Sequence, residues 1–200
     1  MKRINRVFLI RHGQVMDYDK FPVYGHTDVD LTETGVLQME LMAERLRLVE
    51  PTAVYSSDLR RAVIGANLIA CHHNVPIHSL NQLREMDFGD WEGLTMEKIR
   101  NDYPDELQKR QANIINYKAP GGGESIADFS ERVSRAFENL RAEQEGNDII
   151  IVAHGGVNRI ILCNALGLDL SKMYNTHQDY GCLNIIDYFP DSTLVRLING

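Results

Sequence analysis

Residues 7–14 read Val-Phe-Leu-Ile-Arg-His-Gly-Gln, and the interpretation of the whole chain begins with this stretch. Its four apolar residues predict a buried strand that stops abruptly at a cation, an imidazole and a glycine. The glycine permits a close approach to the backbone. A strand of this kind delivers Arg11 and His12 to the edge of a sheet.

Residues 149–156 repeat this layout and read Ile-Ile-Ile-Val-Ala-His-Gly-Gly. One apolar strand ending in His-Gly is weak evidence, because a single histidine at a strand end is commonly an ordinary turn residue. Two such strands, if they are parallel members of one sheet, place His12 and His154 at the same carboxyl edge. Open α/β sheets bind their ligands at that edge.

Length and composition indicate one globular domain over residues 1–200. The chain has 200 residues, of which 44% are hydrophobic, so it can build a core of its own. Its net charge of −7 argues against a general nucleic-acid-binding surface. An anionic ligand therefore requires a few clustered arginines rather than a broad basic face.

The cysteines and the N-terminus suggest where the protein works. Cys71, Cys163 and Cys182 are odd in number and widely spaced, which favours free thiols in a reducing compartment over disulfides or a common zinc site. The apolar run of residues 7–10 is too short for a signal peptide or a membrane span. We expect a cytoplasmic protein with no membrane contact.

Predicted strands alternate with predicted helices along the chain, and the pattern ends in a hairpin. This order predicts a three-layer α/β/α sandwich with a mostly parallel mixed sheet. Besides the two His-Gly strands, short strands are expected at 53–55 and 75–78, and the hairpin at 182–188 and 193–198. Helices are expected at about 32–48, 59–71, 125–145 and 156–166. Ser56, Ser57 and Asp58 are interpreted as caps of the second helix, and Ser125 with Asp128 as a capping box for the third.

The middle of the chain is the least sheet-like part. Short helices are expected at 94–99 and 105–117, so residues 94–123 are interpreted as a small helical insertion over the carboxyl edge of the sheet. Its aromatic residues, together with those of the long loop after the first strand, either line a leaving-group pocket or pack the insertion onto the sheet. The residues concerned are Phe21, Tyr24, Trp91 and Tyr117.

Two arginines lie where a helix does not need them. Arg60 and Arg61 fall in the first turn of a predicted helix, whose positive N-terminal end prefers anions. An external phosphate or carboxylate bound there explains this local misfit. For either arginine alone, the simpler interpretation is a surface cation paired with a nearby carboxylate.

Two histidines, at least two arginines and Glu85 together suggest phosphoryl transfer without a metal. A neutral, oriented imidazole can act as a nucleophile, arginines can hold the oxygens of the phosphoryl group, and a carboxyl group can protonate the leaving oxygen. A metal hydrolase fits less well, because the histidines are scattered and no His-x-x-x-His or Asp-rich ligand run occurs.

The ordered set of motifs resembles the histidine phosphatase superfamily, in its phosphoglycerate-mutase-like branch. The motifs are residues 11–14 (Arg-His-Gly-Gln), 57–62 (Ser-Asp-Leu-Arg-Arg-Ala), 83–89 (Leu-Arg-Glu-Met-Asp-Phe-Gly) and 153–156 (Ala-His-Gly-Gly). The match also takes in residues 25–26, 31–35 and 122–125, and so covers nearly the whole chain. Each motif is short, but their order is highly specific.

The resemblance implies a role for each matching residue. His12 is the expected nucleophile that becomes phosphohistidine, and Glu85 the expected proton donor. Arg11, Arg61 and His154 complete the expected phosphate pocket, since Arg61 directly precedes the Ala62 of the motif. Gln14 and the backbone N–H of Gly155 are further candidates for phosphate contacts. The resemblance implies no metal and no cofactor.

The subfamily and substrate are less determined. The compact length favours a phosphatase acting on a small phosphorylated metabolite, and residues 178–187 are similar to the tail of the α-ribazole phosphatases of cobalamin synthesis. A cofactor-dependent phosphoglycerate mutase and a non-catalytic phosphate-binding relative are the alternatives. Asn158 stands where the family usually has an apolar residue, as a specificity residue or a helix-start hydrogen bond. A homodimer is left open.

Overall fold

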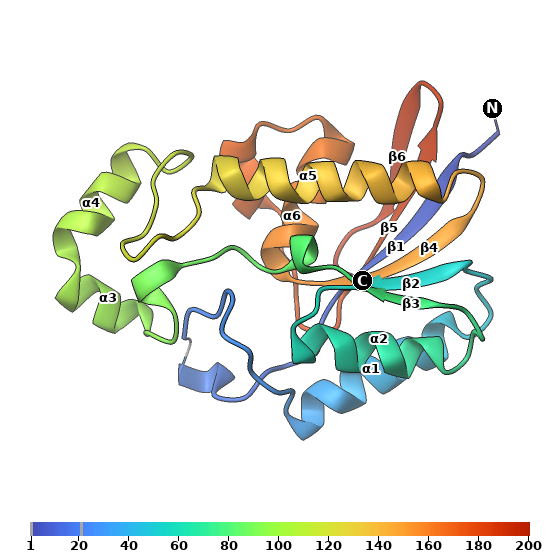
Figure 1. Cartoon of the computed structure of the whole chain (residues 1–200), viewed down its shortest axis with the longest axis horizontal. Helices are drawn as coiled ribbons and strands as arrows, with labels where there is room; N and C mark the ends of the chain where they lie inside the picture. The colour runs from blue at the N-terminus through green and yellow to red at the C-terminus, as the bar shows by residue number, and fades with distance from the viewer. Residues whose placement is uncertain (1, 21) are drawn as a thin grey trace.

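The computed structural model describes residues 2–20 and 22–200, and a six-stranded sheet forms its centre (Figure 1). The strand order is β3-β2-β4-β1-β5-β6. Four neighbouring strands are parallel: Ile77–Ser79 (β3), Ala53–Ser56 (β2), Asp148–Ala153 (β4) and Asn5–Arg11 (β1). The two His-Gly strands, β1 and β4, are therefore parallel members of one sheet, which is the condition for their histidines to meet at its carboxyl edge, and they are also direct neighbours.

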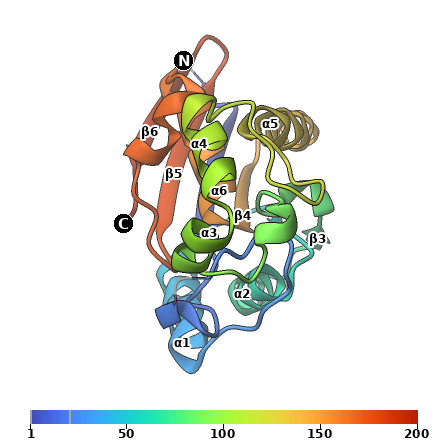
Figure 2. The same ribbon diagram turned by 90° about the vertical axis from the view of Figure 1, so that its left-hand side faces the viewer.

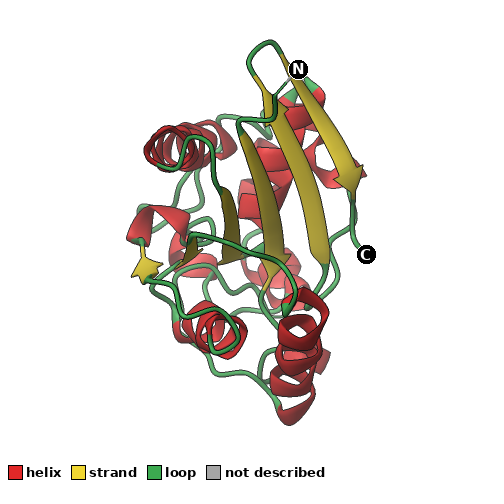
Figure 3. Ribbon diagram, turned by 90° about the vertical axis from the view of Figure 1, so that its right-hand side faces the viewer, coloured by secondary structure: helices red, strands yellow, loops and turns green. Residues whose placement is uncertain are grey.

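Helices cover both faces of the sheet, which confirms the three-layer sandwich (Figures 1 and 3). Glu33–Leu46 (α1) and Arg60–Ala70 (α2) pack on one face, and Ile126–Glu143 (α5) and Gly155–Leu166 (α6) on the other. The strands alternate accordingly: in β1, Val7 and Leu9 join the core under α5 and α6, while Phe8 and Ile10 join the core under α1 and α2.

The C-terminal hairpin extends the sheet in the opposite sense. Leu183–Phe189 (β5) pairs antiparallel with β1, and Ser192–Leu197 (β6) pairs antiparallel with β5. This matches the predicted hairpin and makes the sheet mixed. Short 3₁₀ helices complete the secondary structure at Tyr18–Lys20, Asn81–Leu83, Gly89–Trp91 and Leu170–Asn175. Among the residues described, no helix is both long and apolar enough to cross a membrane.

The predicted helical segments of the middle region are present as Met96–Asp102 (α3) and Pro104–Ala112 (α4), at the end of the molecule away from the N-terminus (Figures 1 and 2). The prediction that the second helix continues to residue 117 is wrong. It ends at Ala112 because the chain turns there and packs Ile114 and Ile115 against the core under α5.

The aromatic residues of this region mostly pack together. Trp91 is buried and stacks on Tyr117, with ring centroids 5.7 Å apart, and both belong to a small separate core with Ile99. Tyr24 packs instead against the core under α1 and α2. Phe21 lies outside the described residues. Packing therefore accounts for Trp91 and Tyr117.

A buried carboxylate fastens the hairpin to the first strand. Asp187 of β5 is fully buried and accepts hydrogen bonds from Arg6 at 2.6 and 2.9 Å and from Arg196 of β6. Burial opposes ionisation, but the bonds from the two arginines outweigh it, so the pKa of Asp187 lies below its ordinary value. The ion group thus joins three consecutive strands of the sheet.

We expect Asp187→Asn to lower the free energy of unfolding by roughly 1.5–3 kcal/mol at neutral pH, because it removes charge-assisted bonds. Since folding lowers the pKa of Asp187, its contribution is complete above about pH 4 and fades as the pH falls through the lowered pKa. Urea unfolding at neutral and acidic pH measures both effects. Asp191→Asn, in the exposed turn of the same hairpin, is the control, and an equal loss in both variants would refute the ion-pair explanation.

Candidate active site

The carboxyl ends of β1 and β4 bring the two motif histidines together. Arg11 lies opposite Ala153 in the parallel register, and the backbone N–H of His12 donates to the carbonyl of Ala153 at 3.0 Å. The next residue of each strand is a histidine, and the imidazole centroids of His12 and His154 are 5.1 Å apart. Both side chains are buried.

The environment of His12 fixes its protonation. Its Nδ1 lies 2.7 Å from the carbonyl oxygen of Gly13, which can only accept, so Nδ1 carries the proton and Nε2 keeps its lone pair. Burial lowers the pKa of His12 well below its ordinary value, and the charges of Arg11 and Arg61 lower it further. His12 is thus a neutral imidazole with a free nitrogen lone pair.

His154 is held in the opposite tautomer. Arg61 Nε donates to its Nδ1 at 3.3 Å, so the ring proton lies on Nε2, 2.7 Å from the hydroxyl of Ser57. Burial, followed by the charge of Arg61, lowers the pKa of His154 well below its ordinary value. The prediction that Ser56, Ser57 and Asp58 cap the following helix is wrong. The cap position of α2 is Leu59, which has no capping side chain, and the three polar side chains bond instead to Ser79, His154 and Arg84.

The sequence left two roles open for Arg60 and Arg61, a surface cation paired with a carboxylate or a ligand of an external anion, and the structure gives the two arginines different surroundings. Arg60 points to the surface and pairs with Asp28 and Asp30, as the simpler interpretation holds. Arg61 is only 1% exposed, and its Nη1 and Nη2 donate to the carbonyls of Thr27 and Gly25 at 2.7 and 2.6 Å. Of the five N–H groups of a guanidinium, the bonds described for Arg61 occupy three.

The loop that receives Arg61 is held from its other side by Glu92. The backbone N–H groups of Gly25, His26 and Thr27 all donate to its carboxylate, at 3.1, 2.9 and 3.0 Å. Burial raises the pKa of Glu92, but these bonds and that of the Thr27 hydroxyl outweigh it, so the pKa is lowered and the group is ionised. Glu92 therefore orders the loop whose carbonyls position Arg61.

Arg11 is oriented by the C-terminal part of the chain. Its Nη1 donates to the carbonyl of Gln178 at 2.6 Å, and its Cζ lies 3.9 Å from the centre of the Tyr180 ring. The Gln178 side chain belongs to a fully buried amide cluster with Asn158 and Asn184, with nitrogen–oxygen separations of 2.8–3.0 Å. Asn158 thus supports the segment that holds Arg11.

The side chain of Glu85, from the loop after β3, lies against the first residues of α6. One of its oxygens accepts the backbone N–H of Gly156 at 2.8 Å, and the other accepts that of Met86 at 2.9 Å. A Cβ on residue 156 would lie 2.1 Å from Glu85 Oε1, so a side chain at this position would displace the Glu85 carboxylate. The motif residues therefore place Glu85 beside the end of β4.

Arg132 of α5 supports the Glu85 loop from behind. Its guanidinium donates to the carbonyls of Gln82, Arg84 and Glu85 at 2.8, 3.1 and 3.2 Å. It also donates two hydrogen bonds to the carboxylate of Glu124, at 2.7 and 2.6 Å. The Glu85 backbone is thus fixed to a long helix rather than left to a free loop.

The two weaker predictions, Gln14 and Gly155, differ in their outcome. Gln14 bonds to α1 and its cap. Its backbone N–H donates to the side-chain oxygen of Gln38 in α1, and its own side-chain oxygen accepts the Thr32 hydroxyl at 2.9 Å. Gly155 lies next to Arg11, whose Nε would be 3.5 Å from a Cβ at that position. The structure therefore gathers Gly155 with the five principal residues, whereas the contacts of Gln14 point elsewhere.

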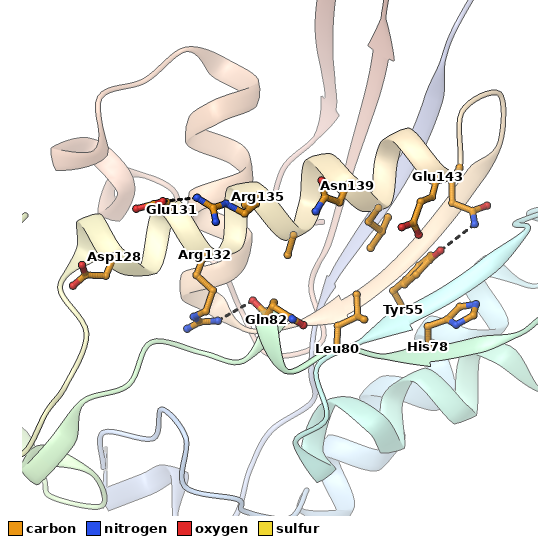
Figure 4. A pocket seen from close by; sticks show the side chains of 13 residues that line it. Tyr55, His78, Leu80, Gln82, Asp128, Glu131, Arg132, Arg135, Asn139 and Glu143 are labelled. Carbon is orange, nitrogen blue, oxygen red and sulfur yellow. Dashed lines mark hydrogen bonds and ion pairs between the residues drawn. The ribbon is translucent and has the colours of Figure 1, made fainter.

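A groove of about 750 Å³ lies on the other side of Arg132, between α5 and the edge strand β3 (Figure 4). It is lined by Tyr55, His78 and Arg135 among others, and none of the predicted site residues lines it. Its arginines are neutralised, since Arg135 pairs with Glu131 and Arg132 with Glu124. The predicted chemistry therefore belongs to the strand ends rather than to this groove.

The arrangement at the strand ends suits a phosphoryl group. It combines a neutral imidazole lone pair, two guanidinium groups with N–H groups to spare, a second neutral imidazole and a carboxyl group beside them. In the part of the chain that the structure describes, no group of three or more His, Cys, Asp and Glu side chains is placed to hold a metal ion.

Several contributors were not given a site role from the sequence. Glu92, Arg132 and Glu124 act through backbone groups far away in the chain, so their contacts have no local signal. Ser57 and Glu124 lie within motifs of the resemblance, but the bond from Ser57 to His154 was not expected. Arg159 of α6 also lies in this region, with its Nη1 3.1 Å from a Cβ placed on Gly155. Its signal was a cation five positions after the motif histidine, on a helix otherwise dominated by apolar residues.

Because burial and neighbouring cations lower both pKa values, we expect the imidazoles of His12 and His154 to stay neutral at about pH 6 in the free protein. We further expect the ring proton on Nδ1 of His12 and on Nε2 of His154. Nitrogen-15 NMR of histidine-labelled protein reads charge and tautomer directly. Observation of two imidazolium rings at this pH would contradict the arrangement.

Ser57→Ala is expected to leave the Nε2–H of His154 buried without an acceptor and to lower the free energy of unfolding by roughly 1–3 kcal/mol. The His154 nitrogen shifts should change at the same time. Ser56→Ala is a matched control, since Ser56 is equally buried and its hydroxyl, among the residues described, bonds only to that of Ser79, at 3.4 Å. Unchanged His154 shifts in Ser57→Ala would rule out the assigned bond.

Comparison with known proteins agrees with this geometry. The chain is 30% identical over 197 residues to the adenosylcobalamin/alpha-ribazole phosphatase of Escherichia coli (strain K12), covering 98% of this chain and 96% of that protein. It is 33% identical over 160 residues to a metal-independent phosphoserine phosphatase of Arabidopsis thaliana, covering 79% and 67% of the two chains. The crystal structure of the alpha-ribazole phosphatase from Shigella flexneri superposes with a TM-score of 0.88 at 30% identity, over 98% of this chain and 96% of that one.

Residues 7–200 match the histidine phosphatase superfamily (branch 1). This match spans the strands, the arginine-bearing helix and the Glu85 loop described above. The chain belongs to the histidine phosphatase superfamily.

Proposed function

We propose that the protein is a metal-independent phosphomonoesterase that works through a phosphohistidine on His12. The observation that carries this proposal is the state of His12, a buried neutral imidazole whose Nε2 lone pair is free. It lies beside Arg11 and Arg61, whose remaining N–H groups suit the charged oxygens of a phosphoryl group.

In the first step, Nε2 of His12 attacks phosphorus, and the bond from phosphorus to the ester oxygen breaks. Protonated Glu85 gives its proton to that oxygen, so the alcohol leaves neutral and Glu85 becomes a carboxylate. Arg11 and Arg61 stabilise the charge on the three remaining oxygens, and the backbone N–H of Gly155 is a further donor. His154 keeps its predicted place in the phosphate pocket only if its Nε2–H leaves the Ser57 hydroxyl for a phosphoryl oxygen.

In the second step, the Glu85 carboxylate takes a proton from water, whose oxygen attacks phosphorus. The phosphorus–nitrogen bond breaks, inorganic phosphate is released, and His12 and Glu85 return to their starting protonation states. Gln14 keeps its predicted place among the phosphate contacts only if its amide nitrogen turns toward the bound group.

The substrate class is a small phosphorylated metabolite. The similar proteins include phosphatases named for α-ribazole phosphate and for phosphoserine, and both compounds are candidates for this chain. We also infer a cytoplasmic setting, consistent with three free cysteines, and a link to cobalamin biosynthesis if α-ribazole 5′-phosphate is the better substrate. A homodimer stays a prediction.

The test measures phosphate release from a panel of phosphomonoesters in the presence of EDTA. We expect unchanged release with the chelator, complete loss in His12→Ala and a loss of about 10²–10⁴-fold in Glu85→Gln. When a reaction with substrate labelled in its phosphoryl group is stopped rapidly without acid, the label should be found on His12. His72→Ala, at an exposed helix end, controls for the loss of any histidine.

Each contrary outcome identifies an alternative. Release that EDTA abolishes, or that survives in His12→Ala, overturns the proposed mechanism. Release only with added 2,3-bisphosphoglycerate, together with isomerisation of phosphoglycerate, identifies a mutase. Binding of phosphate esters without turnover identifies a non-catalytic relative.

A further inference from the structure

Arg159 is a cation of the site region that the proposed mechanism does not use. It is partly buried on α6, and its Nε donates to the carbonyl of Thr176 at 3.0 Å, which anchors the guanidinium. Its Nη1 lies 3.1 Å from the Cβ position of Gly155, and Arg11 Nε lies 3.5 Å from the same point. The two guanidinium groups therefore flank Gly155.

The terminal amino groups of Arg159 are available to a ligand. Among the residues that the structure describes, neither Nη1 nor Nη2 donates a hydrogen bond, and no carboxylate forms an ion pair with the group. The other arginines around the Glu85 loop are neutralised directly, Arg84 by Asp58 and Arg132 by Glu124. Burial lowers the pKa of Arg159.

The position of Arg159 relative to Glu85 indicates which part of a substrate it meets. Glu85 accepts the N–H of Gly156, and Arg159 lies over the preceding residue, Gly155. In the proposed mechanism Glu85 protonates the leaving oxygen, so the atoms bonded to that oxygen extend past Glu85. A guanidinium at this place therefore faces the leaving group as well as the phosphoryl oxygens.

We propose that Arg159 binds a carboxylate carried by the leaving group, so that the protein prefers phosphate esters of hydroxy acids to those of uncharged alcohols. This inference rests on the proposed function and names its substrate class. A planar guanidinium matches a carboxylate through two parallel hydrogen bonds, and the carboxylate supplies the partner that the fold withholds from Arg159.

The experiment compares substrates that differ in the carboxylate alone. O-phosphoserine and O-phosphoethanolamine share the phosphate ester and the ammonium group. We expect wild-type kcat/KM to be higher for phosphoserine, and Arg159→Gln to lower it by roughly 10–100-fold while phosphoethanolamine changes less than about threefold. Arg159→Lys, which retains the charge without the planar fork, should restore part of the preference.

Arg135→Gln, on the exposed face of α5 and paired with Glu131, is the matched control and should leave both substrates unchanged. Calorimetric binding of the two ligands to His12→Ala, with and without Arg159→Gln, tests the preference independently of turnover. Equal kcat/KM for the two substrates in the wild type, or an equal fall for both in Arg159→Gln, overturns the inference. Failure of every ester in the wild type overturns the proposed function, while the binding measurement still decides the role of Arg159.

Discussion

Burial of two imidazoles beside guanidinium groups is the constraint on which the site depends. Desolvation and like charge both disfavour an imidazolium, so His12 and His154 are neutral, and the N–H of each neutral ring needs an acceptor. The Gly13 carbonyl and the Ser57 hydroxyl select opposite tautomers for the two rings. The guanidinium of Arg61 is bonded to backbone carbonyls rather than to a carboxylate, which preserves its charge for an external anion.

The loops that provide these carbonyls must therefore be held in place by other contacts. Gly25 and Thr27 are ordered by Glu92, and the Gln178 carbonyl that holds Arg11 is ordered by an amide cluster buried beneath it. In each case the compensating polar group contacts the loop from the side away from the cation. The carboxyl groups of Glu85 and Glu92 thereby accept bonds from backbone N–H groups, where they do not compete with a phosphate for Arg11 and Arg61.

The sequence predicted what is written in local patterns, namely the strands, the helices beside them, the hairpin and the residues at the two His-Gly motifs. The prediction of Arg61 over Arg60 came from the family resemblance, and the ion pairs with Asp28 and Asp30 account for the surface position of Arg60. Glu92 and Arg132 could not be found in this way, because the loop backbone groups that they position lie 47 to 67 residues away in the chain and are brought to them only by the tertiary fold. Ser57 was misread for the same reason: a local capping rule competed with a bond across the sheet edge to His154, and the buried imidazole won.

The net charge of −7 and an anionic ligand are compatible because electrostatics in salt is local. At physiological ionic strength the screening length is about 8 Å, so acidic groups across the molecule contribute little at the strand ends. There Arg11, Arg61 and Arg159 act in partly buried surroundings, where charge interactions are stronger than in water. Arg11 and Arg61 are placed by a strand end and a helix start, whereas the side chain of Arg159 projects from α6 and is anchored by one bond to the carbonyl of Thr176. Recognition of the leaving group can therefore change through a single helix position while the phosphoryl pocket stays as it is.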